Sequence, residues 1–168
     1  EELPEYTKEE KIRVKGKSQD GMTIAILVNT TKKEVVADAQ GEFNSEVSLS
    51  KDSPNEIYAY AVNNSGVQSG TSKKYIVNFD DKPPVLEIIN PSSGSTYYLE
   101  TQRNQRIEGQ TEKNVSITIN DRIAIVNNEN KFNYPIRLEN GENKFTIIAR
   151  DQAGNETKIE DYVLNLSL

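Results

Sequence analysis

The feature that most limits how this chain can fold is an internal repeat. Residues 57–66 and residues 145–154 both contain alternating apolar residues, an alanine at the same place, and a polar turn that ends in glycine. The other matching pairs include Gly16 with Gly109, Ile24 with Ile117, Phe43 with Phe132, Leu49 with Leu138, Asn55 with Asn143, Ile57 with Phe145, and Ala61 with Ala149. Similarity of this kind is typical of duplicated structural units, and it predicts two tandem domains rather than one enzyme core.

Within each copy, apolar residues alternate with polar ones at a period of two, which is the pattern of half-buried strands. Residues 115–119 and 145–149 follow this pattern, and no segment shows a convincing helical period. Asn120-Asp121 predicts a tight turn, and Asn140-Gly141 predicts a hairpin because both residue types tolerate a positive φ. Short strands separated by turn residues at this spacing predict an all-β fold, with an antiparallel sandwich in each half.

The boundary between the copies is expected at Asp80-Asp81-Lys82-Pro83-Pro84. Proline fixes φ and cannot donate a ladder hydrogen bond, so two prolines in a row favour an extended and fairly stiff connection. We therefore expect domain 1 at residues 1–81, domain 2 at residues 82–168, and a short Pro-Pro linker that restricts their orientations.

Composition excludes several classes of function. The chain has 168 residues and a formal net charge of −6, and the acidic excess is divided equally between its halves. Nucleic acids and anionic membranes attract basic surfaces, so neither is an expected partner, and any membrane attachment is expected through segments outside this chain. The chain has no His and no Cys, which excludes His-based triads, Cys–His nucleophiles and the usual zinc sites. We expect no enzyme activity and no cofactor.

The 26 Asp and Glu residues raise the questions of a glycosidase and of a calcium site. A glycosidase needs two acids that face each other across a cleft, whereas most of these carboxylates fall on solvent-facing strand or turn positions. Asp80, Asp81, Asp151 and Asn155 could meet at the domain junction and bind calcium, which takes six to eight oxygen ligands. Too few ligands are clustered for that number, and Asp151 also fits a turn residue that bonds its own backbone. We favour the turn interpretation and predict no metal site.

One surface of the first copy is unusually apolar. If Ile57 points inward, as the alternation requires, then Tyr58, Tyr60 and Val62 point outward, and Ile76 on the neighbouring final strand also lies outside. Tyrosines of this kind suit contacts with proteins or sugars because the ring is apolar and its tip is polar. Outward aromatic residues also stabilise strands as cross-strand pairs, and this simpler interpretation is favoured. These four residues remain the candidate interaction surface.

The second half resembles a known family. Its motifs are Pro84-x-Leu86-x-Ile88-x-x-Pro91-x-x-Gly94, Ile107-x-Gly109, Val115-x-Ile117-x-Ile119-Asn120, Leu138-x-x-Gly141-x-Asn143 and Ala149-x-Asp151-x-x-Gly154-Asn155. They are similar to bacterial immunoglobulin-like modules, above all the accessory domain B of glucodextranase and its relatives, and residues 12–80 show weaker versions of the same motifs. The resemblance implies an immunoglobulin-like fold. It also implies a role as a spacer or binding unit in exported and surface proteins, or as an appendage of carbohydrate-active enzymes.

The first copy departs from this pattern at its beginning. The second copy opens with residues 85–89 before an Asn-Pro turn, whereas residues 1–11 contain no counterpart, and Leu3–Thr7 align with Tyr97–Thr101. Domain 1 is therefore expected to lack its opening strand. An exposed edge recruits other strands, so we expect this edge to be covered by a neighbouring chain or frayed. We further expect domain 1 to be the less stable one, and residues upstream of Glu1 to complete it.

The function expected from these observations is a non-catalytic tandem spacer or interaction segment of an exported or cell-surface bacterial protein. The alternative is a carbohydrate-binding accessory region of a polysaccharide-degrading enzyme. Sugar binding usually needs exposed planar aromatic side chains, and because the chain has no Trp, only tyrosines could provide them. A protein or a carbohydrate at the cell surface is the expected partner.

Overall fold

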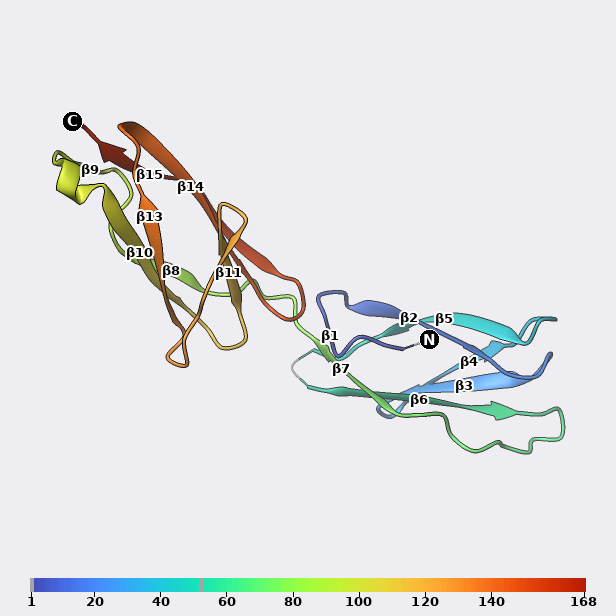
Figure 1. Cartoon of the computed structure of the whole chain (residues 1–168). Helices are drawn as coiled ribbons and strands as arrows, with labels where there is room; N and C mark the ends of the chain where they lie inside the picture. Colours follow the sequence, from blue (N-terminus) through green and yellow to red (C-terminus); the bar gives the residue numbers. More distant parts are fainter. Residues whose placement is uncertain (1, 52) are drawn as a thin grey trace. The chain divides into compact units, whose positions relative to one another are not determined.

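The computed structural model describes residues 2–51 and 53–168, and the chain forms two compact units. Unit 1 ends at Asp81 and unit 2 begins at Lys82. Both units consist of strands and loops (Figure 1), and the one helical element among the described residues is the short 3-10 turn η1 at Glu100–Gln102. The all-β prediction is confirmed. In the described part of the chain, no helix is long and apolar enough to cross a membrane.

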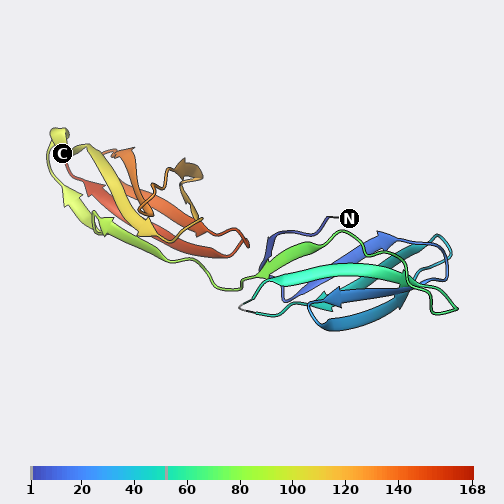
Figure 2. The ribbon, with the colours of Figure 1, turned by 90° about the horizontal axis from the view of Figure 1, so that it is seen from below.

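Unit 1 contains a five-stranded sheet and a two-stranded sheet, visible as separate layers in Figure 1 and seen from below in Figure 2. The larger sheet has the order β1-β7-β6-β3-β4, and the smaller one pairs β2 with β5. All of these pairs are antiparallel except β1 with β7. The strands are β1 Tyr6–Thr7, β2 Lys11–Lys17, β3 Thr23–Val28, β4 Thr31–Val36, β5 Glu42–Ser48, β6 Asn55–Val62 and β7 Tyr75–Phe79.

Unit 2 repeats this arrangement with one strand more in its smaller sheet. Its larger sheet has the order β12-β11-β14-β15-β9, and its smaller sheet has the order β13-β10-β8. The parallel pair is again the short strand with the final strand, here β9 with β15. The strands are β8 Leu86–Asn90, β9 Ser95–Tyr97, β10 Asn104–Thr111, β11 Ser116–Ile119, β12 Arg122–Ala124, β13 Lys131–Arg137, β14 Gly141–Arg150 and β15 Glu156–Leu166.

Each unit has its own hydrophobic core between its two sheets. In unit 1, Val14 of β2 belongs to the same buried cluster as Ile26 and Ile57 of the larger sheet. In unit 2, Ile107 of β10 clusters in the same way with Ile147. The apolar pairs matched by the repeat, Ile24 with Ile117, Phe43 with Phe132, Leu49 with Leu138, Ile57 with Phe145 and Ala61 with Ala149, belong to these two cores as buried members or as half-buried members packed against them. The predicted correspondence of the cores is confirmed, because a period of two places alternate residues on the inner face.

The turn predictions had different outcomes. Asn120 and Asp121 form the two-residue turn between β11 and β12, both with positive φ, at 46° and 62°. The hairpin predicted at Asn140-Gly141 is wrong, since β13 pairs with β10 whereas β14 pairs with β11 and β15. Gly141 does have a positive φ, so the local turn signal is real. The signal indicates where the chain turns, but which sheet the next strand joins depends on distant pairing.

The two units differ most at their beginnings. β8 pairs with β10, whereas β2 pairs only with β5 among the described strands of unit 1. β1 takes the place of β9, since Thr7 lies opposite Phe79 as Tyr97 lies opposite Leu166. The sequence alignment, which matched Leu3 with Tyr97, is therefore wrong by four residues. A parallel pair of two residues has no alternation long enough to reveal its register.

The exposed segment that joins the units contains only one of the two prolines that the sequence placed in the linker. Pro84 is fully buried, and its carbonyl accepts a hydrogen bond from the Thr157 hydroxyl. On the other side, the Asp81 carboxylate lies 2.7 Å from the Lys51 Nζ of unit 1. Residues 80–83 are exposed. Pro84 is thus part of the packing of unit 2, and the exposed connection ends at Pro83.

Candidate functional site: an outer face and an open groove of unit 1

The four residues predicted as an interaction surface lie on one face of the larger sheet of unit 1. Residues directly opposite each other in an antiparallel pair share a face. The relevant pairs are Tyr58 with Leu27, Tyr60 with Ala25, Val62 with Thr23, and Ile76 with Glu56. Ile57, the neighbour of Tyr58, is buried in the core on the other face. We call the outer surface formed by Tyr58, Tyr60, Val62 and Ile76 the tyrosine face.

The side chains of the tyrosine face are not equally exposed. Ile76 is 48% exposed, whereas Tyr58, Tyr60 and Val62 are half-buried. Ala25 is fully buried although it lies on this outer face opposite Tyr60, so its larger neighbours cover it. Part of the aromatic surface therefore stabilises the sheet by cross-strand packing, and the rest faces solvent.

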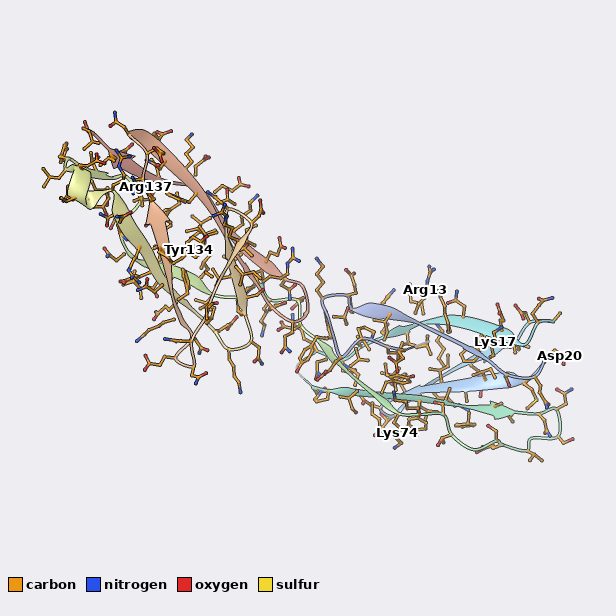
Figure 3. The ribbon with its side chains drawn as sticks, in the orientation of Figure 1. Arg13, Lys17, Asp20, Lys74, Tyr134 and Arg137 are labelled. Atoms are coloured by element: carbon orange, nitrogen blue, oxygen red, sulfur yellow. The ribbon has the colours of Figure 1, made fainter. Side chains whose placement is uncertain are left out.

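A charged pair borders the tyrosine face. Lys74 Nζ lies 2.8 Å from a Glu56 carboxylate oxygen and 4.9 Å from the centre of the Tyr58 ring, a cation–π distance. Lys74 lies on the side of unit 1 away from Arg13 (Figure 3). The hydrogen bond to Glu56 raises the pKa of Lys74 above its usual value. This face combines apolar rings with fixed charges, an arrangement that suits recognition and supplies no reactive group.

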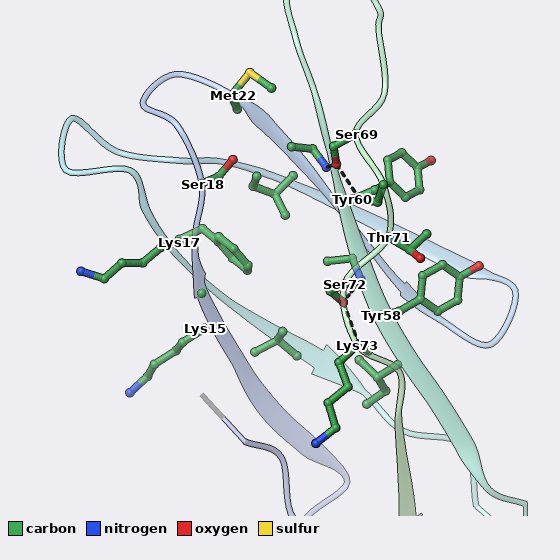
Figure 4. Close-up of a pocket in the computed structure, with 18 of the residues that line it drawn as sticks. Lys15, Lys17, Ser18, Met22, Tyr58, Tyr60, Ser69, Thr71, Ser72 and Lys73 are labelled. Carbon is green, nitrogen blue, oxygen red and sulfur yellow. Dashed lines mark hydrogen bonds between the residues drawn. The ribbon is translucent and has the colours of Figure 1, made fainter.

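A groove opens on unit 1 between β2 and the chain that precedes β7 (Figure 4), and Tyr58 and Tyr60 of the tyrosine face are among its lining residues. Its volume is about 730 Å³. One wall is Val14–Lys17 of β2, and the other is formed by residues 69–73. Core residues, among them Phe43, Ala59 and Ala61, form its apolar floor. We call this site the open groove.

One reason for the open groove is that the last strand of unit 1 is short. β14 and β15 pair along their whole length, whereas β6 and β7 pair only over Asn55–Ile57. Beyond that point two serines replace the strand, as the dashed bonds in Figure 4 show: the N–H groups of Ala59 and Ala61 donate to the hydroxyls of Ser72 and Ser69 at 3.0 and 2.9 Å. The serine N–H groups donate in turn to the same alanine carbonyls, at 2.7 and 2.9 Å. The segment is held against β6 without continuing the ladder.

Positive charge lies at the rim of the open groove. Lys17 Nζ lies 2.8 Å from a Glu42 carboxylate oxygen, and the hydrogen bond between them raises the pKa of Lys17. Lys73 Nζ lies 3.4 Å from Glu2 and 4.9 Å from the centre of the Tyr75 ring. No Asp or Glu is among the described residues that line the groove. The groove therefore offers an apolar floor and a cationic rim, and it lacks the acids of a glycosidase.

The residues considered for calcium have other roles in the described structure. The Asp151 carboxylate accepts hydrogen bonds from the N–H and the side-chain amide of Asn155, at 2.8 and 2.9 Å, and so closes its own turn. Asp80 and Asp81 belong to unit 1. Among residues 2–51 and 53–168, no three or more His, Cys, Asp or Glu side chains form a group that could hold a metal ion.

A second, polar groove of about 570 Å³ lies on the smaller sheet of unit 2. Asn90, residues 104–106, Glu108 and residues 135–137 line it. Glu108 is the one carboxylate among these residues, and the Asn133 amide donates a hydrogen bond to it at 2.8 Å. The lining contains no aromatic residue among those described, so a sugar ring would find no planar surface there.

The sequence analysis located the tyrosine face and missed the open groove. A signal for the groove was present, because Ser69-Gly70-Thr71-Ser72 interrupts the alternation before Tyr75, whereas the second copy continues without a break from Glu156. Combined with the missing counterpart of residues 85–89, this interruption indicates that both strands along one side of the first sandwich are reduced.

Comparisons with known proteins agree with this architecture. The family model of glucodextranase domain B matches residues 84–164, which is most of unit 2. Over 156 residues the chain is 32% identical to Bacillopeptidase F of Bacillus subtilis (strain 168), a match that covers 90% of this chain and 10% of that protein. The chain thus spans only about a tenth of the length of this relative.

Solved structures show the same fold. The fibronectin(III)-like modules of Clostridium thermocellum CbhA match with a TM-score of 0.57 and 14% identity, covering 98% of this chain and 89% of that one. A bacterial ice-binding adhesin matches with a TM-score of 0.41 and 15% identity, over 94% of this chain and 58% of that chain, and at that score the likeness carries no weight. Domain B is a non-catalytic type of domain, which indicates an accessory module. The chain consists of two tandem domains with an immunoglobulin-like fold, and residues 84–164, in the second domain, match the family model of glucodextranase domain B.

Proposed function

We propose that this chain is a non-catalytic spacer and interaction segment of an exported or cell-surface bacterial protein. The observation that carries the proposal is that each unit has a core of its own, and that neither groove presents a pair of acids or any His or Cys among its described residues. Two consecutive domains with separate cores lengthen a protein without adding a catalytic site. The 32% identity to a small part of a much longer peptidase supports an accessory role of this kind.

The spacer role is tested at the connection between the units. Replacement Pro83→Gly leaves the buried Pro84 in place and frees the exposed residue before it, so the range of orientations widens. We expect a broader distance distribution in small-angle X-ray scattering. Pro4→Gly, at an exposed proline inside unit 1, is the matched control and should leave the distribution unchanged. Identical curves for Pro83→Gly and the parent chain would refute a linker-controlled spacer.

The second candidate function is carbohydrate binding, favoured by the half-buried tyrosines of the tyrosine face. Titration calorimetry with a panel of soluble glucans, dextran included, separates the two candidates. The double variant Tyr58→Thr/Tyr60→Ile gives unit 1 the residues that unit 2 has at these places, Thr146 and Ile148, and so preserves strand-forming residue types. Binding that disappears in this variant would establish the carbohydrate function. No binding heat with either protein is the result that the spacer proposal predicts.

A further inference from the structure

Unit 2 shows what lies at the position that is open in unit 1. β8 runs antiparallel to β10, with Glu87 opposite Gln110, and Leu86 and Ile88 pack against the core. No described strand of unit 1 has this position beside β2. Because the larger sheets of the two units have the same strand order, the open groove marks the place that a strand like β8 would fill.

Matching residues of the two cores differ in exposure because of this position. Gly109, Phe132 and Ala149 are buried in unit 2, with Phe132 3% and Ala149 0% exposed. Their counterparts are of the same residue type, yet each is half-buried. These counterparts, Gly16, Phe43 and Ala61, all line the open groove. The difference therefore comes from what lies over these residues and not from the residues themselves.

The backbone of β2 is oriented to accept a further strand. The Leu49 N–H donates to the Glu10 carbonyl at 2.8 Å, so Glu10 and every second residue after it direct their backbone groups toward β5. Lys17 belongs to the alternate set and directs its N–H and C=O toward the opposite edge. Its counterpart Gln110 faces β8 in the same way, since β10 has the equivalent register with β13 and β8.

A glycine beside a phenylalanine makes room for such a strand. A Cβ atom at Gly109 would lie 2.5 Å from the Glu87 carbonyl oxygen and 2.5 Å from Cζ of Phe132. Glycine is thus required for the close approach of β8. Unit 1 keeps the pair, with a Cβ at Gly16 only 2.6 Å from Cζ of Phe43. Unit 1 therefore keeps the space that a strand like β8 would need to pair with β2.

Lys17 favours an acidic residue in a strand that adds to β2. In unit 2, the Gln110 amide donates to the Glu87 carboxylate at 2.6 Å. At the position of Gln110, unit 1 has Lys17, an exposed ammonium that pairs with Glu42 at 2.8 Å. An ammonium has three donors, so Lys17 can also donate to an acidic side chain of the added strand. The residues on either side of that acid would point into the apolar floor, as Leu86 and Ile88 do in unit 2. The fitting pattern is aliphatic, acidic, aliphatic.

We propose that the open groove of unit 1 binds an extended peptide with the pattern aliphatic–acidic–aliphatic, which adds to β2 as an antiparallel strand. Main-chain hydrogen bonds to β2 provide affinity, and the apolar floor together with Lys17 provides selectivity. Tyr58 and Tyr60 of the tyrosine face also contribute to the lining of the groove. The peptide site does not depend on the proposed function.

The test is a titration of the ¹⁵N-labelled whole chain with a synthetic peptide that has the sequence of residues 84–91. Amide signals of Lys17, Ala61 and Ser69–Ser72 should shift saturably, and hydrogen exchange at the Lys17 amide should slow. A peptide with Lys in place of its Glu should bind roughly tenfold more weakly, the scale of a charged contact at a partly exposed rim. The chain variant Lys17→Glu should reverse this preference, and Ala61→Leu should abolish binding by filling the floor.

Three results would overturn the proposal. The first is no saturable shift in unit 1 at millimolar peptide. The second is a shift confined to unit 2, which would mean that the peptide displaces β8. The third is concentration-dependent self-association in sedimentation, with the same amides perturbed in the absence of peptide, which would mean that a second copy of the chain covers the groove.

Discussion

The two units share a core but differ along one side. Both have a five-stranded sheet of the same strand order, with the short parallel strand next to the final strand. Unit 2 covers the side of its core with β8 and the eleven-residue β15, whereas unit 1 has the five-residue β7 and an open groove. The difference teaches that the repeated residues fix the core, while the segments between and before them decide how well it is covered.

Both units contain a hydrogen-bonded asparagine at the same place in the fold. Asn55 donates to the carbonyls of Ser50 and Val77 at 3.0 and 3.1 Å and accepts from the Ser50 N–H at 2.7 Å. Asn143 repeats these bonds with the Glu139 backbone at 2.9 and 2.8 Å, and donates to the carbonyl of the final strand at 3.3 Å. In each unit, the asparagine side chain thus connects the turn before its own strand, β6 or β14, to the last strand, β7 or β15, by hydrogen bonds.

The largest expected effect comes from removing this amide. Asn55→Ala removes the partner of the buried Val77 carbonyl and of the Ser50 backbone groups, and we expect unit 1 to lose about 3 kcal/mol of unfolding free energy. Asn143→Ala in unit 2 should cost less, about 1–2 kcal/mol, because Asn143 is half-buried and water can replace its bonds. Hydrogen exchange measured peptide by peptide reports each unit separately. An equal loss in both units would show that the difference in burial between the two asparagines has no energetic effect.

The next effect concerns the matched alanines. Ala149→Leu adds volume at a site with 0% exposure, and we expect unit 2 to lose about 2 kcal/mol by overpacking. Ala61→Leu directs the same added volume into the open groove, so its effect on unit 1 should be close to zero or stabilising. Thermal unfolding followed by calorimetry should show one lowered transition in the first variant and none in the second. A comparable destabilisation by Ala61→Leu would mean that the groove is closed in solution.

A smaller effect is expected at the matched glycines. Gly109→Ala forces the backbone of β8 or the Phe132 ring to move, with an expected cost of about 1–2 kcal/mol. Gly16→Ala requires only the Phe43 ring to move, and the groove beside it has room, so its cost should stay below about 1 kcal/mol. Chemical denaturation followed by NMR gives both values. A higher cost at Gly16 would show that the Phe43 ring cannot move into the groove.

The smallest expected effect is a response to acid in unit 2. Hydrogen bonds from Arg103 and Lys158 lower the pKa values of Glu100 and Glu160 below the usual 4.5. A carboxyl with a lowered pKa in the folded state adds stability that is present above its unfolded pKa and is lost as pH falls through the folded value. Unit 2 should therefore weaken slightly below about pH 4.5, and less so at high salt because these pairs are exposed. Glu160→Gln should reduce this slope in exchange-monitored unfolding, and an unchanged slope would contradict it.

Much of this molecule follows from local patterns in its sequence. The period of two indicated the strands, the inner and outer faces of β6, and with them the position of Tyr58 and Tyr60 on an outer face. Asn120-Asp121 indicated a tight turn because few other residue types accept a positive φ at both positions. The repeat indicated which core residues correspond, since a register slip by one residue would move every side chain to the wrong face.

Only the tertiary structure decided the features that depend on pairing between distant segments. It showed that the Asn140-Gly141 turn crosses between the sheets, that Thr7 and not Leu3 corresponds to Tyr97, and that Pro84 is a buried residue of unit 2. It also revealed the open groove, which exists because two serines take the place of a continued strand beside β6. Periodicity is a property of neighbouring residues, whereas the partner of a strand is set by backbone hydrogen bonds to chain far away, which no local pattern specifies.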